Sequence, residues 1–295
     1  MSAATPAVDL SRLPAPSVVG VSDLETIVAA RLADLQQRDP DFDALVESDP
    51  ALKLQETDAY RELMALAAIN DAARSRMLAF ALGPDLDHLA AFYDVPRLVI
   101  APASGSTPAV MEGDEAFRRR VLLAPKSFAG AGPHGAWLFH ALSADARVLN
   151  ADVWSPAAGQ VTVAVQSREG DGTASDELVE AVRLHLAQKH IKPMTDMLTV
   201  RSVVNVPYAI EVQGYVQPGP SLQLIRAEMI AALQAMAATR RTPSRDVPRS
   251  AIYAAASVGP IDKVIVVTPS EDIARANGEV GVCTAIDVTV SDYAG

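Results

Sequence analysis

The chain is poor in cysteine and in aromatic residues. It contains one cysteine among 295 residues, and aromatic residues make up 5% of the sequence. A single cysteine, Cys283, allows neither a disulfide within the chain nor a cysteine cluster that binds a metal. Few aromatic rings leave few surfaces on which nucleic-acid bases could stack. These absences argue against a disulfide-stabilised scaffold and against a reader of single-stranded nucleic acid.

Basic charge and long apolar runs are also missing. The formal net charge is −11 and the pI is about 4.9, whereas proteins that bind nucleic acid usually carry a basic surface. No apolar run approaches the ~20 residues that span a bilayer. The opening residues, "MSAATPAVDL", lack the basic start and apolar stretch of a secretory signal. We therefore expect a protein of a reducing, soluble compartment that does not contact nucleic acid or enter a membrane.

Helical periodicity dominates the first third of the chain. Residues 1–21 hold several prolines and predict an extended arm. With Ser22 or Asp23 as the N-cap, the apolar residues that follow recur at helical spacing. They are Leu24, Ile27, Val28, Leu32 and Leu35.

A second helix is predicted to begin at Asp49, an N-cap followed by proline, and to continue to Leu82. Gly83 and Pro84 end it, and Asp85 would cap the short helix that follows. A helix this long needs a partner along its length, from the same chain or from another. Its apolar side includes Tyr60, Leu63, Met64 and Ala67.

The remainder alternates strand and helix patterns, so the predicted fold class is α+β: long N-terminal helices for a multi-chain bundle, then mixed α/β interaction domains. The predicted divisions are an arm (1–21), a helical core-bundle region (22–100), a linker (101–113) and α/β units at 114–206 and 207–295. "GAWLFHALSADARVLNADVWSP" and "RSAIYAAASVGPIDKVIVVTP" share one order of elements. This echo favours an internal duplication.

The glycine pattern in "APKSFAGAGPHGAW" resembles a dinucleotide-binding loop but lacks its context. Gly130, Gly132 and Gly135 follow a helical pattern instead of a strand, and Pro133 lacks one of the N–H groups that such a loop uses. We interpret the segment as a turn in which Gly132 and Gly135 are structural. The nearby run Arg118–Arg120 is interpreted as the solvated side of a helix.

No other motif predicts an active site. The five histidines lack metal-ligand spacing, and "SREGDGTASDE" lacks the spacing of a calcium loop. Thr173 and Asp176 instead suggest a capping box. Cys283 has no base in its vicinity in the sequence and is predicted to be a small core residue. We therefore predict no catalytic, cofactor-binding or metal-binding residue, and a protein that is not an enzyme.

Several long stretches resemble the baseplate assembly protein J family of contractile-tailed phages and R-type pyocins (tailocins). They include "LSRLPAPSVV", "KLQETDAYRELMALAAINDAARSRMLAFALGPDLDHLAAFYDVPRLVI" and "DEAFRRRVLLAPKSFAGAGPHGAWLFHALSADARV". "YAIEVQGYVQPGPSLQLIRAE" and "RSAIYAAASV" extend the match nearly to the C-terminus. Because the similarity keeps its order along almost the whole chain, it is more specific than any short motif.

The resemblance implies a structural wedge component that is assembled in the bacterial cytoplasm and located in the tail baseplate. Two copies would join one protein I-like tail protein through a helical bundle, and wedges would form a ring that opens when the sheath contracts. Neighbouring wedges, a sheath-proximal baseplate protein and the central hub and spike would be further partners. The family implies no cofactor and no catalytic residue.

Two other functions stay open at this point. One is a cytoplasmic assembly adaptor or chaperone that uses the 22–36 and 50–82 helices and leaves the finished particle. The other is an α/β enzyme built on residues 114–295, which would need a pocket with convergent polar groups.

Overall fold

The computed structural model describes residues 10, 13–20, 22–42, 46, 49–129, 132–219 and 221–292. Most of the predicted arm and Gly130 of the glycine loop lie outside these residues. Contacts divide the chain into two compact units. Of the described residues, one unit contains those from 10 to 96 together with 113–118, and the other contains 97–112 and those from 119 onward. The fold is mixed α/β, with three small sheets among the described residues.

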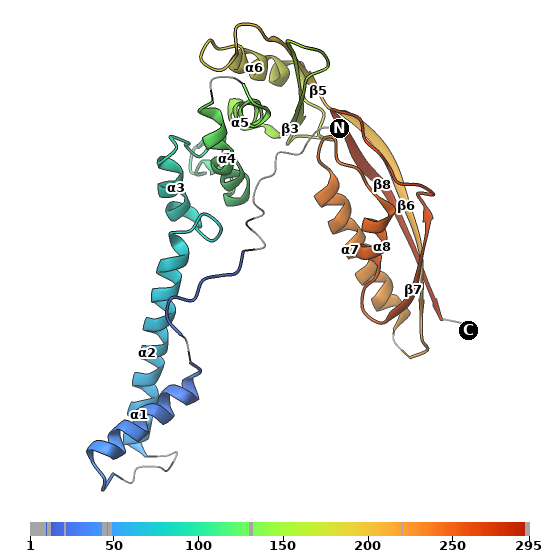
Figure 1. The fold of residues 1–295 in the computed structure, drawn as a ribbon. Helices are drawn as coiled ribbons and strands as arrows, with labels where there is room; N and C mark the ends of the chain where they lie inside the picture. The colour runs from blue at the N-terminus through green and yellow to red at the C-terminus, as the bar shows by residue number, and fades with distance from the viewer. Residues whose placement is uncertain are drawn as a thin grey trace. The chain divides into compact units, whose positions relative to one another are not determined.

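The first unit is helical. Helix α1 (Leu24–Arg38) begins at Asp23, whose carboxylate accepts from the Thr26 N–H at 2.7 Å. Helix α2 (Pro50–Ser75) begins at Asp49, whose carboxylate accepts from the Ala51 N–H at 2.8 Å. These acidic caps satisfy N–H groups that a helix start leaves free. Helix α1 lies across the N-terminal half of α2 (Figure 1).

The long helix is shorter than predicted, because α2 ends at Ser75 and not at Leu82. Residues 76–80 form turns, in which the Met77 N–H donates to Arg74 O and the Phe80 N–H donates to Met77 O. The Arg118 guanidinium then binds the freed carbonyls of Leu78 and Ala81, both at 2.7 Å. An arginine distant in sequence thus stabilises the early end of the helix.

Helix α3 (Gly83–Ala91) corrects the prediction for Asp85. The helix begins at Gly83, so Asp85 lies in its first turn and not at the N-cap. Gly83 has a positive φ of 49°, which glycine tolerates best. Its N–H is bound by the carboxylate of Asp114, at 3.0 Å.

Helix α4 (Asp114–Ser127) runs from the first unit into the second. The interpretation of its Arg118–Arg120 run as a solvated face was wrong for two of the three residues, because Arg118 is partly buried and Arg120 is buried, whereas Arg119 is exposed. Arg119 donates to Asn150 at 2.7 Å, and partial desolvation by the surrounding protein lowers the pKa of its guanidinium. Arg120 is 3% exposed and pairs with Glu112, which is 2% exposed, at 2.7 Å. Before α4, strands β1 (Val99–Ala101) and β2 (Val110–Met111) form a hairpin that begins at the end of the predicted helical region and extends through the predicted linker.

The first larger sheet has the order β3-β4-β5, with β3 at Val148–Trp154, β4 at Gln160–Ser167 and β5 at Met197–Ser202. Strand β4 is antiparallel to β3 and parallel to β5. Helices α5 (His134–Ala144) and α6 (Asp176–Leu186) pack on it around a core that contains Trp137, Val163 and Leu178.

Two turn predictions in this region have different outcomes. The cap of α6 is Ser175, whose hydroxyl accepts from the Leu178 N–H, so the predicted Thr173–Asp176 capping box does not form.

In the glycine turn before α5, Gly132 has a φ of 62°, and a Cβ there would lie 2.9 Å from Pro193 Cγ. Gly135 lies in the first turn of α5 against α4, where a Cβ would lie 3.1 Å from Lys126 Cβ. Gly132 therefore occupies a position that disfavours a side chain, whereas a side chain at Gly135 would require Lys126 to move.

The second larger sheet has the order β7-β6-β8, with β6 at Val204–Val216, β7 at Ile261–Thr268 and β8 at Glu279–Asp292. Helices α7 (Leu222–Arg240) and α8 (Arg249–Ala256) cover one face (Figure 1). Buried residues alternate along β6, as expected for a sheet covered on one side. As in the first sheet, the central strand has one antiparallel and one parallel neighbour.

Candidate functional site

The apolar stripe of α1 is directed mainly into its own chain. Ile27 is buried at 7% exposure, and Leu24, Val28, Leu32 and Leu35 are partly buried. Arg31 fixes the crossing, because it donates to Glu62 at 2.9 Å and to Gln55 at 3.2 Å on α2. A groove of about 560 Å³ lies along this contact. Five of the predicted interface residues therefore belong to a helix that already has an intrachain partner.

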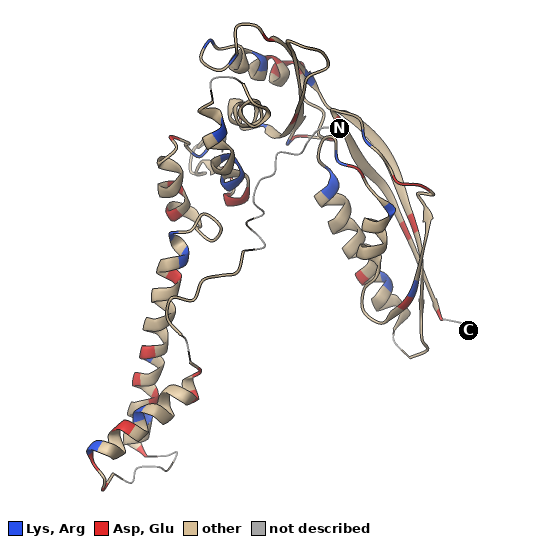
Figure 2. Cartoon of the chain, in the orientation of Figure 1, with Lys and Arg blue, Asp and Glu red and all other residues tan. Residues whose placement is uncertain are grey.

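Helix α2 keeps a second apolar surface exposed. Tyr60 and Met64 are 54% and 52% exposed, whereas Leu63 and Ala67 are partly buried. Tyr60 and Met64 are four residues apart and so lie on one helix face. Charged residues of both signs occur along the rest of α1 and α2 (Figure 2). Of the predicted interface residues, Tyr60 and Met64 are the most accessible to another chain.

Asn70 fastens the arm to α2, which sequence reasoning missed. Its side chain is buried at 4% exposure. Asn70 Oδ1 accepts from the N–H groups of Val18 (2.8 Å) and Val19 (3.1 Å), and Nδ2 donates to Val19 O at 3.0 Å. The sequence offered one signal for this contact, namely a polar residue on the apolar side of a long helix. Residues 13–20 therefore form a strap held on α2.

Three histidines that are separated in sequence come together beside the first large sheet. The rings of His140 on α5 and His185 on α6 are 5.9 Å apart. Burial, followed by the charges of His185 and His190, lowers the pKa of His140 to about 4. Burial and His190 also lower the pKa of His185. Within the described part of the chain, no group of three or more His, Cys, Asp and Glu could hold a metal ion.

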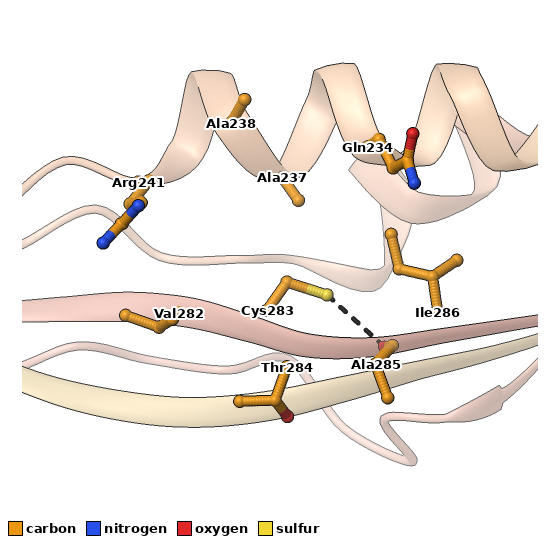
Figure 3. A pocket seen from close by; sticks show the side chains of 9 residues that line it. All are labelled: Gln234, Ala237, Ala238, Arg241, Val282, Cys283, Thr284, Ala285 and Ile286. Atoms are coloured by element: carbon orange, nitrogen blue, oxygen red, sulfur yellow. Dashed lines mark hydrogen bonds between the residues drawn. The ribbon is translucent and has the colours of Figure 1, made fainter. Parts of the chain in front are cut away.

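A groove of about 380 Å³ lies between the C-terminal half of α7 and strand β8. Figure 3 shows Gln234, Ala237 and Ala238 above it and Cys283 and Thr284 below it. The Cys283 thiol donates to Ala285 O at 3.4 Å, and burial raises its pKa. A neutral thiol is a poor nucleophile. The lining residues thus supply a small depression of mixed polar and apolar character and no activated nucleophile.

The two larger sheets are joined by a buried polar contact. Asp152 on β3, 7% exposed, accepts from the Ser244 hydroxyl and, at 3.0 Å, from the Gly278 N–H. Around it, Trp154 and Val282 pack against buried Ala164, Val203 and Val280. We call this set the sheet joint. The sequence around Asp152 did not predict this contact, because its partners Ser244 and Gly278 lie far along the chain.

Comparison with known proteins assigns the chain to a family. Residues 47–104 match the model of the baseplate J-like N-terminal domain. The chain is 40% identical over 290 residues to "Baseplate protein J" of Escherichia phage P2, and the alignment covers 95% of this chain and 96% of that protein. The chain belongs to the baseplate protein J family. This is a family of structural baseplate proteins and not an enzyme family, and it indicates a structural component of a phage tail baseplate.

The family assignment covers both units of the chain. The matched domain model spans the end of the arm-bearing unit, from just before α2 to the first strand of the hairpin. The longer alignment includes the two larger sheets as well. No helix among the described residues is long and apolar enough to cross a membrane.

Proposed function

We propose that this protein is a wedge component of a contractile phage tail or tailocin baseplate. Two copies join one protein I-like tail protein through helices α1 and α2, and wedges associate with their neighbours and the central hub into a ring. The α/β units meet neighbouring copies, and the ring opens when the sheath contracts. Assembly occurs in the bacterial cytoplasm before the particle is complete.

The observation that carries this proposal is the accessible surface of α2 in a chain that aligns almost fully with a baseplate protein J. Tyr60 and Met64 present apolar side chains on a helix whose opposite side is already covered by α1 and the strap. A contiguous exposed apolar patch is a candidate site of protein contact. A further chain can therefore pack on α2 without displacing α1.

We further propose that the two α/β units arose by internal duplication. The support is their shared strand pairing: in each sheet the central strand has one antiparallel and one parallel neighbour. The strand-to-helix pair β4–α6 corresponds to β6–α7, and the helix-to-strand pair α5–β3 corresponds to α8–β7. The two pairs occur in opposite order along the chain.

The test of the wedge is the mass, by light scattering, of this protein co-expressed with the protein I-like product expected beside its gene. A stable two-to-one complex is the expected result. Met64→Asp should weaken that complex by at least tenfold, because a charge would be buried without a partner in the helix contact. Leu184→Asp on α6 is the matched control, since Leu184 is similarly exposed at 57%.

Two outcomes would contradict the proposal. A monomer that ignores the partner would remove the wedge and favour an adaptor that does not stay in the particle. A complex that tolerates Met64→Asp as well as Leu184→Asp would show that α2 is not the contact. Circular dichroism of each variant checks that both stay folded.

A further inference from the structure

Two connections beside the first large sheet meet and carry exposed apolar side chains. In the turn after α4, a Cβ on Gly132 would lie 2.9 Å from Cγ of Pro193, which belongs to the connection between α6 and β5. Phe128 precedes this turn, and Met194 directly follows Pro193. Phe128 is 68% exposed and Met194 is 99% exposed, more than any other large apolar residue of the described chain.

Three lysines lie in the same two segments as these apolar side chains. Lys126 is in the last turn of α4, just before Phe128, whereas Lys189 and Lys192 precede Met194 in the connection after α6. Among the described residues, none of the three forms an ion pair. Their charges are therefore not neutralised by a neighbouring carboxylate.

Acidic residues are absent from both segments. Residues 116–144 and 181–195 contain no Asp or Glu, although the chain has a net charge of −11. At the other end of the layer formed by α5 and α6, Asp145 and Glu177 both pair with Arg147. The helix layer thus separates its acidic end from its basic end. We define the lysine surface as the set Lys126, Phe128, Lys189, Lys192 and Met194.

The connection that carries Lys189, Lys192 and Met194 is folded onto the protein. The N–H groups of Ile191 and Lys192 both donate to Gln188 O, at 3.0 and 2.9 Å. Ile191 also packs against the core of the first large sheet. A segment that is already ordered loses less conformational entropy when a partner binds.

Helix geometry explains the lysines but not the apolar side chains. Helices α4 and α6 both end at this surface, and cations near a helix C-terminus complement its dipole. That effect gives no reason to leave Phe128 and Met194 in water. Methionine adapts its shape to a partner and is frequent at protein-binding surfaces. The combination favours a partner that is both acidic and partly apolar.

We propose that the lysine surface docks a short acidic segment of a partner protein. Carboxylates of that segment pair with the lysines, and its apolar side chains cover Phe128 and Met194. This inference goes beyond the proposed wedge contact, because it assigns a second surface on the other compact unit of the chain.

Charge favours a short segment over a larger polyanion. A nucleic-acid binder commonly makes ~6–10 phosphate contacts, more than three lysines supply. An anionic membrane presents its charge over a wide plane. Either would place like charges opposite the acidic remainder of a chain whose net charge is −11. A short segment can reach the lysine surface alone.

Peptide binding to the full chain tests the lysine surface. The probe is a fluorescein-labelled peptide of three Glu-Asp-Leu repeats, and fluorescence anisotropy measures its affinity. A Gln-Asn-Leu peptide removes the charges, and a Glu-Asp-Ser peptide removes the apolar side chains. The Glu-Asp-Leu peptide should bind at least tenfold more tightly than either control, and added salt should weaken it. Equal affinity for either control would overturn the proposal.

Substitutions locate the binding. Lys189→Glu should weaken peptide binding at least fivefold, because an attractive charge becomes repulsive, and Met194→Ser should weaken it at least threefold. Lys263→Glu makes the same change in net charge at an exposed position on β7 and should keep the original affinity. Circular dichroism checks the fold of each variant. If Lys263→Glu weakens binding as much as Lys189→Glu, net charge governs the binding and the proposal fails.

Competition identifies the kind of partner. Vesicles that contain phosphatidylserine and a DNA duplex should both fail to displace the peptide. If either displaces it from the unmodified chain, the surface fits a membrane or a nucleic acid better than an acidic segment, and the proposal fails.

The outcome is separate from that of the wedge proposal, because peptide binding is measured on the free chain. A two-to-one complex whose free chain ignores the peptide keeps the wedge and rejects the lysine surface. Peptide binding by a chain that forms no two-to-one complex rejects the wedge and keeps the lysine surface.

Discussion

At the scale of single residues, polar side chains buried by distant parts of the chain were the hardest to predict. The run Arg118–Arg120 follows the acidic sequence "MEGDEAF" and has the local pattern of a solvated face. Its partners are the carbonyls of Leu78 and Ala81, the amide of Asn150 and the carboxylate of Glu112. Local periodicity shows which side of a helix is polar, but it cannot show what covers that side.

His140 gives the first prediction, a loss of stability in mild acid. Burial lowers its pKa to about 4 in the folded protein, whereas an unfolded histidine titrates near 6.5. Between these values the unfolded chain binds more protons, so the free energy of unfolding falls as the pH decreases from about 6.5 to 4. Thermal denaturation at several pH values measures this effect. His140→Gln should reduce the slope, and His88→Gln, at an exposed position, should leave it unchanged. Equal slopes in all three proteins would contradict the prediction.

At the scale of elements, the start of the long helix was predictable from local sequence, whereas its end and two other helix starts were not. Asp49 before Pro50 is a local signal, and the structure uses it as an N-cap. The N-caps lie at Leu82, which makes no side-chain cap bond, and at Ser175, instead of the predicted Asp85 and Thr173. The turns that follow the end of α2 at Ser75 are bound by Arg118, which no window around the helix contains.

Asn70 gives the second prediction, on the strap. Asn70→Ala removes both acceptor and donor, leaving the Val18 and Val19 backbone groups without their partner. Loss of such buried bonds should cost about 1–3 kcal/mol and accelerate hydrogen exchange at the two N–H groups. Asn70→Asp keeps the acceptor and loses the donor, so its exchange should be intermediate. Protection unchanged in Asn70→Ala would show that the strap does not depend on this side chain.

At the scale of the whole molecule, the alternation of strands and helices gave the fold class but not the contacts between sheets. The Ser244–Asp152 bond joins residues that are 92 positions apart. A single acid in an acidic sequence offers no signal for such a pairing. The sequence predicted the candidate interface residues as apolar stripes on two helices. Only the structure showed that the stripe of α1 is covered by α2, whereas Tyr60 and Met64 on α2 are accessible.

The sheet joint gives the third prediction, on cooperativity. Asp152→Ala leaves the Gly278 N–H and the Ser244 hydroxyl without their acceptor, which should cost about 1–3 kcal/mol. The two sheets should then unfold in separate steps, visible in calorimetry, whereas we expect both to unfold in one transition in the unmodified protein. Asp262→Ala, at an exposed position on β7, is the control. A single unchanged transition in Asp152→Ala would mean that the apolar part of the joint suffices.

The sheet joint also has a mechanical consequence. Its Asp152–Gly278 bond is buried, while Ser244, Trp154 and Val282 are partly buried. Water therefore has little access to the Gly278 N–H when the protein is loaded. A force applied to one sheet can pass to the other through this side-chain contact as well as through the short backbone connection between β5 and β6.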